Sequence, residues 1–422
     1  MKHKKTTLKN GLRILTIPMR GTQTATVLVM VGVGSRFESE KEAGLSHFIE
    51  HMMFKGTKKR PTSLIITSEL DSIGGEFNAF TSKEYTGYYA KVNAKHIEKA
   101  MDVVSDMYLN SKLEEKEIER EKGTVLQELN MIEDMPMRNV EDVMEGLLYQ
   151  KNSLERDIVG NKKSVSSFSQ KDFLNYMKRY YVANNTVVCV AGKIDEKKIV
   201  GDIKKYFSKM AKGKKPGFQK VLENQKTPQV KIKNKKTDQT HLSLGVRAFD
   251  YYHKDRFILS VLATILGGNM SSRMFIEVRE RKGLAYFIKT SIETFADCGY
   301  LTTQAGVEHK NIELTIKTVL NEYKKIASRL VGAEELKKAK EYLKGKAVMS
   351  LESSDEVAMF LIDQEIKNKK VMEIGDIFKR IDAVNQEDIL RVAKNIFQSE
   401  KLNLAVIGPH KNIKQLESIV KF

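Results

Sequence analysis

Residues 44–57, GLSHFIEHMMFKGT, place His47 and His51 four positions apart, with Glu50 directly before the second histidine. Residues four positions apart share one face of a helix, so both imidazoles can reach one point, and Glu50 leans toward the same point. Two neutral imidazoles are common ligands of zinc, and a nearby carboxylate can take a proton from a water at such an ion. The pattern therefore indicates a metal site with a general base beside it.

A zinc ion that takes part in chemistry needs a third protein ligand and one open position. The helical segment 113–134, LEEKEIEREKGTVLQELNMIED, offers several carboxylates, most of which should face solvent. Glu128 differs because it lies among apolar residues, and Glu121 lies seven positions earlier on the same helix face. A carboxylate buried among leucines is costly unless it meets a cation. Glu128 is therefore the predicted third ligand.

The elements that must position these residues are mixed in type. Strands alternate with helices without strict βαβ order, which favours an α+β fold: a mostly antiparallel sheet with helices packed on one face. The segment EFNAFTSKEYTGYYAKV, 76–92, is expected to form one long strand, because it is rich in Thr, Tyr and Phe. The other expected elements are strands at 12–18 and 24–34 and helices at 43–55, 63–73, 94–110 and 114–133.

The chain repeats itself at about half its length. SFSQKDFLNYMKRYYVANNTVVCVAGKI and AVNQEDILRVAKNIFQSEKLNLAVIGPH each read as a capped amphipathic helix, a loop and a strand that ends in Gly. The offset from Gln170 to Gln386 is 216, and HIEKAMDVVSDMY matches NIELTIKTVLNEY at an offset of 215. We therefore expect two homologous halves. The predicted domains are 1–208, which carries the metal site, and 230–422, joined by a Lys- and Gly-rich linker at 209–229.

The second half supplies an internal comparison for the metal site. At an offset of 212 it places Leu259, Leu262 and Ala263 where the first half has the two histidines and Glu50. The alternative interpretation of the trio is a pair of core histidines hydrogen-bonded to a glutamate. Because the same fold accepts apolar residues at these positions, the polar trio needs another reason, and metal chemistry supplies one.

Composition narrows the function classes. The chain has 422 residues, a net charge of +18 and only two cysteines, which are expected to be buried free thiols in a reducing compartment. The sequence shows no secretory signal and no apolar run long enough to span a membrane, so a cytoplasmic location without a membrane partner is expected. Lysines are scattered along helix faces without interleaved aromatics, so no specific nucleic-acid binding is expected.

Three segments resemble one known family: GLSHFIEHMMFKGTKKRP, GGEFNAFTSKEYTGYYAKV and EREKGTVLQELNMIEDMP. They are similar to the pitrilysin/insulinase family of zinc peptidases, whose mark is the inverted H-x-x-E-H order. The resemblance covers nearly the whole chain and includes GGNMSSRMFIEVRERKGLAYFIKT in the second half. It looks closest to bacterial members related to mitochondrial processing peptidase.

The resemblance implies a role for each matching residue. His47, His51 and Glu128 match the zinc ligands, Glu50 matches the catalytic base, and Glu121 matches a second glutamate that supports the site. The remaining matches concern the bound peptide: Asn78 and Ala79 on an edge strand hold its backbone, and Arg279 and Tyr286 in the second half close over it.

The resemblance also implies an activity and an assembly. It implies a zinc-dependent endopeptidase, with one zinc per chain, that cleaves unfolded peptides or short protein segments inside a closed chamber. The family builds that chamber from four such halves, so a homodimer is implied. The ligand set would also accept manganese or cobalt. The alternative function is a non-catalytic scaffold subunit of the same fold, as in respiratory complexes, although such relatives lack an intact H-x-x-E-H.

Overall fold

The computed structural model describes residues 3–214, 217–368 and 371–422. They form two compact units that interleave along the sequence. Unit 1 contains residues 1–130, 156–219 and 347–374, and unit 2 contains 131–155, 220–346 and 375–422. One passage between the units, from Gln219 to Lys220, lies inside the predicted linker 209–229.

Unit 1 is built on a six-stranded sheet in the order β1-β2-β6-β3-β5-β4. All neighbouring strands are antiparallel except β2 and β6, so the sheet is mostly antiparallel, as predicted. Its strands are β1 (Lys4–Thr7), β2 (Arg13–Pro18), β3 (Thr24–Val31), β4 (Glu76–Thr81), β5 (Thr86–Asn93) and β6 (Thr186–Gly192). Its helices before the linker are α1 (Leu45–Met52), α2 (Ser63–Asp71), α3 (Ile97–Asn110), most of α4 (Glu115–Glu133), α6 (Lys162–Ser167), α7 (Gln170–Tyr180) and α8 (Glu196–Phe207).

Unit 2 repeats this plan with a five-stranded sheet in the order β7-β11-β8-β10-β9. As in unit 1, one pair of neighbouring strands is parallel, here β7 with β11. The predicted repeat is confirmed, because α7 corresponds to α14 (Gln386–Ile396) and β6 to β11 (Leu402–Gly408). The other strands are β7 (Gln229–Asn234), β8 (Thr240–Ala248), β9 (Ala285–Thr294) and β10 (Gly299–Val307). The other helices are α9 (Arg256–Gly267), α10 (Ile312–Ser328), α11 (Ala333–Ser350, mostly in this unit), α13 (Ile374–Asp382) and α15 (Ile413–Ile419).

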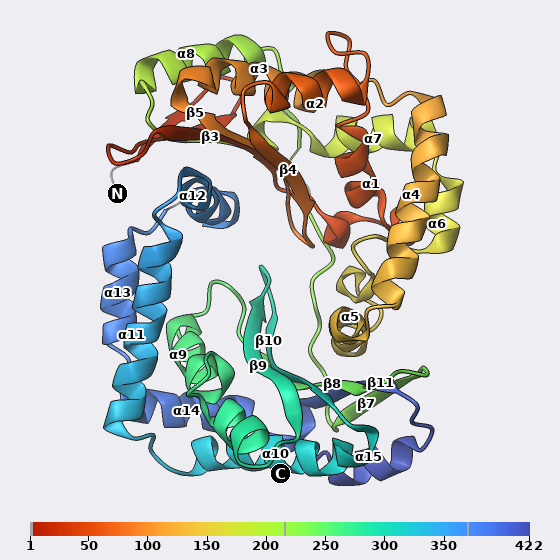
Figure 1. The fold of residues 1–422 in the computed structure, drawn as a ribbon, viewed down its shortest axis with the longest axis vertical. Helices are drawn as coiled ribbons and strands as arrows, with labels where there is room; N and C mark the ends of the chain where they lie inside the picture. The colour runs from red at the N-terminus through yellow and green to blue at the C-terminus, as the bar shows by residue number, and fades with distance from the viewer. Residues whose placement is uncertain (1–2, 215–216, 369–370) are drawn as a thin grey trace. The chain divides into compact units, whose positions relative to one another are not determined.

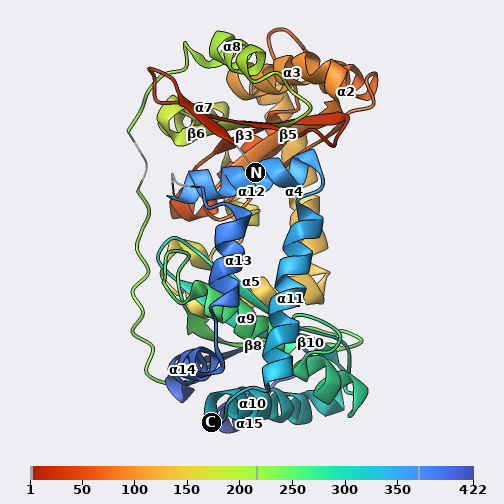
Figure 2. The same cartoon turned by 90° about the vertical axis from the view of Figure 1, so that its left-hand side faces the viewer.

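Each unit also contains one helix from the other half of the sequence. Helix α12 (Ser354–Asn368) packs on β3 and β6 of unit 1, on the face opposite α2, α3 and α8 (Figures 1 and 2). Helix α5 (Pro136–Leu148) packs on β8 and β11 of unit 2. The helices of the same half cover one face of each sheet, as predicted, and the exchanged helix covers the other face.

Apolar packing and a buried ion pair hold α12 on its sheet. Val357, Ala358, Leu361 and Ile362 of α12 are fully or almost fully buried against the second face of that sheet. Glu365 is completely buried, and one of its carboxylate oxygens lies 3.1 Å from a guanidinium nitrogen of Arg13 and 2.7 Å from the Lys5 ammonium. Removing one partner of such a pair leaves a buried charge without compensation, which is strongly destabilising.

The expected long strand at 76–92 is wrong. Residues 76–93 form a hairpin, in which β4 pairs antiparallel with β5 from Glu76↔Lys91 to Thr81↔Thr86. The turn between them is SKEY, in which the Ser82 amide donates to the Tyr85 carbonyl at 2.8 Å and the Ser82 hydroxyl accepts from the Glu84 and Tyr85 amides. This serine-based turn contains no Gly, Pro or Asn, so it lacks the usual sequence signal for a turn.

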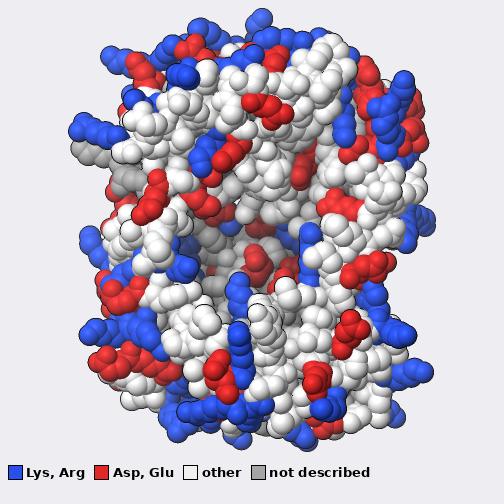
Figure 3. All heavy atoms as spheres, viewed as in Figure 1, with Lys and Arg blue, Asp and Glu red and all other residues white. Residues whose placement is uncertain are grey.

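The expectation of two buried thiols outside any disulfide is confirmed. Neither Cys189 nor Cys298 forms a disulfide, both are buried, and burial raises the pKa of the Cys189 thiol. Within the described residues, no helix is long and apolar enough to cross a membrane. On the face drawn in Figure 3, Lys and Arg side chains are interspersed with Asp and Glu.

Candidate metal centre

The helix that carries the H-x-x-E-H motif begins at a backbone position that requires glycine. Gly44, directly before α1, has φ of 95°, and a Cβ built there would lie 2.5 Å from the Val159 carbonyl oxygen. An L-residue is therefore strained here both in conformation and in space. This fixes the point at which the chain enters the helix.

A buried carboxylate caps the same helix end. The two carboxylate oxygens of Glu38 accept hydrogen bonds from the amides of Gly44 (2.8 Å) and Ser46 (2.7 Å). Burial raises the pKa of Glu38 to about 7, against the opposite effect of these hydrogen bonds. Glu38 thus satisfies amides at the start of α1 that have no partner within the helix.

Apolar packing then sets which face of α1 remains for chemistry. Leu45, Phe48, Ile49 and Met52 are completely buried. The Ser46 hydroxyl is also buried and lies 2.7 Å from the Tyr176 hydroxyl. The motif's two histidines and Glu50 are left on the remaining face, as the sequence predicts.

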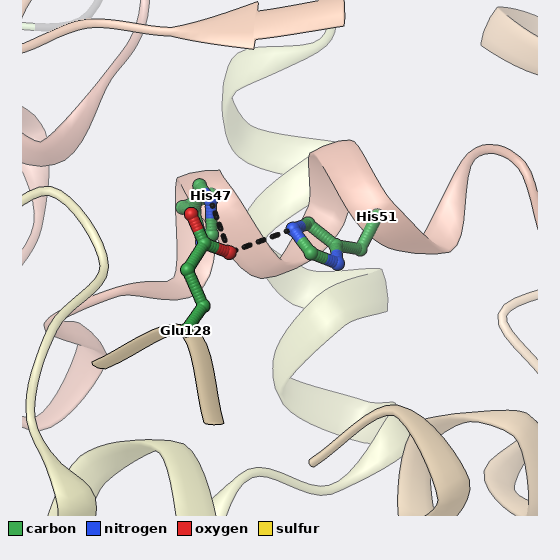
Figure 4. Close-up of side chains that lie close together, drawn as sticks. All are labelled: His47, His51 and Glu128. Carbon is green, nitrogen blue, oxygen red and sulfur yellow. Dashed lines mark ion pairs between the residues drawn. The ribbon is translucent and has the colours of Figure 1, made fainter. Parts of the chain in front are cut away.

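The structure brings the three predicted ligands together, as Figure 4 shows. One carboxylate oxygen of Glu128, from α4, lies 3.5 Å from His47 Nε2 and 3.4 Å from His51 Nε2. Two atoms each about 2.1 Å from a tetrahedral zinc ion are about 3.4 Å apart, so these separations match those of zinc ligands. The donor set and its spacing therefore fit a zinc ion.

A carboxylate behind the cluster orients one of the imidazoles. His51 Nδ1 lies 3.0 Å from one oxygen of Glu121, and the other oxygen lies 2.5 Å from the Lys55 ammonium. Such a bond fixes the ring tautomer so that Nε2 presents its lone pair to a metal. Glu121 therefore contacts the candidate ligand His51 from α4. His47 Nδ1, in contrast, is buried without a hydrogen-bond partner among the described residues.

The charges of the cluster depend on each other. Burial alone would lower the pKa of His51, but hydrogen bonds to Glu121 and Glu128 outweigh it and raise that pKa to about 9. Hydrogen bonds from the two histidines hold the pKa of Glu128 well below its usual range. Burial would raise the pKa of Glu121, yet its bonds to His51 and Lys55 lower it. The pocket thus stabilises positive charge between two carboxylates, as a site for a divalent cation would.

The predicted base, Glu50, has a partner that the sequence did not indicate. The Thr81 hydroxyl donates to one carboxylate oxygen of Glu50 at 2.6 Å. Thr81 is the last residue of β4 and lies 31 positions along the chain from Glu50. Glu38 and Lys55 were also missed. A threonine after NAF and a glutamate before the helix carry no spacing signal, so only the folded chain shows what they contact.

The predicted peptide-binding residues Asn78 and Ala79 lie on β4, which is the edge strand of its sheet and contacts α1. They pair with Tyr89 and Tyr88 of β5 on one side. The Asn78 side-chain oxygen accepts from the Ala79 amide at 2.9 Å. The other side of β4 pairs with no described strand, so its backbone groups can accept an added strand.

The predicted Arg/Tyr pair is also together, within unit 2. Arg279 lies on a π-helix, Phe275–Glu280, and its guanidinium lies 4.6 Å from the Phe275 ring centroid and 4.8 Å from that of Tyr286. Short π-helical segments often occur at functional sites. Tyr286 is 81% exposed, an unusual fraction for an aromatic ring, so it is free to contact a ligand.

Comparison with known proteins agrees with this geometry. Residues 13–162 match the family model described as insulinase (peptidase family M16), and residues 167–343 match the peptidase M16 inactive domain. An uncharacterized zinc protease of Bacillus subtilis, YmxG, is 36% identical over 97% of this chain and 99% of its own length. An uncharacterized zinc protease of Streptomyces coelicolor is 34% identical over 97% of this chain and 90% of its own length.

Solved structures show the same fold at lower identity. A protease from Helicobacter pylori superposes with a TM-score of 0.90 at 24% identity, covering 97% of this chain and 99% of its own. A chain of complex III2 from Candida albicans superposes with a TM-score of 0.86 at 19% identity, covering 99% of this chain and 100% of its own. The predicted family and fold class are confirmed, and the chain belongs to the insulinase family of peptidases, family M16.

Proposed function

We propose that this chain is a zinc-dependent endopeptidase that hydrolyses unfolded peptides or short protein segments. The observation that carries the proposal is the cluster of His47, His51 and Glu128, whose ligand atoms lie within 4.8 Å of one another on the helix pair that also carries Glu50. These three residues would hold one zinc ion per chain. Relatives that match almost end to end are named zinc proteases, which supports the same activity.

Bound zinc would supply Lewis acidity, which lowers the pKa of a water and polarises a carbonyl group. The chain's own residues would supply the proton transfers and the positioning. Glu50 takes a proton from the attacking water and returns it to the leaving amine. Glu121 holds the His51 ring in the tautomer that leaves Nε2 free. The family resemblance implies that Arg279 and Tyr286 close over the bound peptide, where one or the other would donate a hydrogen bond to the oxygen that becomes negative.

The edge strand supports the proposed substrate class. A peptide that adds to β4 beside Asn78 and Ala79 is held mainly through its backbone, so selection depends little on side chains. Only an extended segment can pair in this way, which favours unfolded peptides over folded proteins. We also propose a homodimer that encloses the peptide in a chamber.

The alternative function is a non-catalytic scaffold. Two observations favour it: the match of residues 167–343 to an inactive domain and the fold shared with a chain of complex III2. The intact trio of His47, Glu50 and His51 favours the peptidase, because a scaffold has no use for a metal site. Mass measurement by light scattering separates the proposed homodimer from a monomer in either case.

The test is cleavage of a mixed pool of unstructured peptides of roughly 10–30 residues, read by mass spectrometry, with bound zinc measured in parallel. Glu50→Gln should lose cleavage by a factor of about 10²–10⁴ and keep its zinc. Glu119→Gln, an exposed carboxylate on α4, is the matched control and should cleave like the wild type. Absence of both zinc and cleavage in the wild type would favour the scaffold.

A further inference from the structure

Thr81 connects the edge strand to the predicted base. Its hydroxyl donates to Glu50 Oε2 at 2.6 Å, a length typical of a hydroxyl bonded to an ionised carboxylate. This bond joins two elements with different tasks: α1 carries the base and two metal ligands, and β4 is the edge to which a peptide can add. Among the described residues, no other side chain of β4 is hydrogen-bonded to the Glu50 carboxylate.

The hydroxyl is held in place by a rigid hairpin. Thr81 pairs with Thr86 in the last rung of the β4–β5 ladder, directly before the Ser82–Tyr85 turn. The Thr86 hydroxyl is itself buried and donates to the Val33 carbonyl at 3.0 Å. The backbone of Thr81 is therefore anchored to the sheet, which fixes the point from which its hydroxyl reaches Glu50.

The alternation of side chains along β4 directs the Thr81 side chain toward α1. Side chains of successive residues point to opposite faces of a strand. Phe80 packs with the core on the α12 face of the sheet, so its neighbour Thr81 points to the other face. Phe77, four residues before Thr81 and therefore on the same face, has its ring centroid 6.4 Å from that of Phe54, just beyond the end of α1.

We propose that Thr81 is a positioning residue for the general base. Glu50 is half-buried, and its side chain has several rotatable bonds. The hydrogen bond from Thr81 to Oε2 restricts that side chain and leaves Oε1 for the attacking water. Because Thr81 belongs to the strand that binds the peptide, the base keeps a fixed position relative to the docked backbone. This inference rests on the proposed peptidase function.

The test is a pair of substitutions that separate the hydroxyl from the shape of the side chain. Thr81→Val keeps the branched shape and removes the donor, whereas Thr81→Ser keeps the donor. Thr81→Val should lower kcat by about tenfold or more, less than the 10²–10⁴ expected for loss of the base, with KM within about twofold of the wild type. Thr81→Ser should stay within about threefold of the wild-type kcat. Bound zinc should be unchanged in both variants.

The matched control is Thr67→Val on α2. Its hydroxyl bonds to the Ser63 carbonyl of its own helix, so the same hydroxyl-to-methyl change there should leave kcat unchanged. A crystal structure of Thr81→Val gives a readout that needs no turnover, and it should show the Glu50 carboxylate rotated from its wild-type position. Thr81→Ala is the second hydroxyl-free variant if Thr81→Val does not fold.

Each result decides one claim. A Thr81→Val protein with wild-type kcat and an unmoved Glu50 overturns the role of Thr81 and leaves the peptidase standing. A raised KM at constant kcat also overturns it, because Thr81 would then serve peptide binding alone. If the wild type cleaves nothing, the proposed function fails, and the crystal structure alone decides whether Thr81 holds Glu50.

Discussion

Removal of the metal should make the stability of this protein fall as the pH rises from 6.5 to 9. The pKa of His51 is raised from 6.5 to about 9 by Glu121 and Glu128, in spite of burial, so the metal-free folded state binds that proton more tightly than the unfolded state. For a raised pKa the stabilisation is complete below the unfolded value of 6.5 and is lost as the pH passes through 9. The difference corresponds to about 3 kcal/mol of unfolding free energy.

Thermal unfolding in excess chelator at pH 6.5, 7.5 and 9 measures this loss. For a unit of this size 1 kcal/mol shifts Tm by about 2–4 °C, so Tm of the transition that includes unit 1 should fall by about 6–12 °C. Zinc-loaded protein should not show this fall, because the ion replaces the proton at His51 and binds more tightly as the pH rises.

Glu121→Gln is the control that isolates His51 from the other histidines. The variant loses the anionic partner of Nδ1, so the pKa of His51 should move back toward 6.5 and the fall in Tm should shrink. A metal-free wild type with constant Tm between pH 6.5 and 9 would refute the reasoning. An equally steep fall in Glu121→Gln would refute the assignment to this pair.

Three further predictions concern the ligand set and the packing around it. Loss of a residue that only hydrogen-bonds a metal ligand typically weakens metal binding by roughly 10–100-fold. Glu128→Gln changes a ligand itself, so it should weaken zinc binding by more than this, as measured by competition with a chromophoric chelator. Gly44→Ala should lower the unfolding free energy by about 1–3 kcal/mol because of the positive φ, and the close contact with Val159 should lower it further. The control is Gly201→Ala on α8, where a Cβ meets nothing within 4 Å. This change should leave the unfolding free energy equal or raise it by about 0.4–1 kcal/mol. Glu365→Ala should cost about 3–5 kcal/mol in urea unfolding because Arg13 and its charge stay buried.

The two candidate histidine ligands could be predicted from the sequence because their geometry is local. His47 and His51 occupy one turn of a single helix, so their spacing alone fixes their common direction. Glu128 could be predicted because a carboxylate on an apolar stripe is energetically unusual. Thr81 and Glu38 make contacts that depend on the tertiary fold, and no periodicity in the sequence encodes such contacts.

The sheet edge and the exchanged helices α5 and α12 show two other limits of prediction from the sequence. The sequence predicts one strand for the hairpin of β4 and β5 because SKEY folds back through side-chain bonds of Ser82 and contains no Gly, Pro or Asn. The amphipathic pattern of α5 and α12 predicts that each buries an apolar face. It does not identify the sheet that receives it, because both sheets offer similar surfaces of branched aliphatic side chains.

The exchange of α5 and α12 has a consequence for how the chain is made. On a ribosome, the first sheet is synthesised once β6 has emerged at Gly192, yet the helix that covers its second face begins only at Ser354. During the intervening 161 residues the apolar side chains of that face, among them Leu15, Leu28 and Cys189, have no cover from α12. Unit 1 therefore cannot complete its core while the chain is growing through unit 2. Its completion waits for nearly the whole protein, and this delay is where a nascent-chain chaperone would have the most to protect.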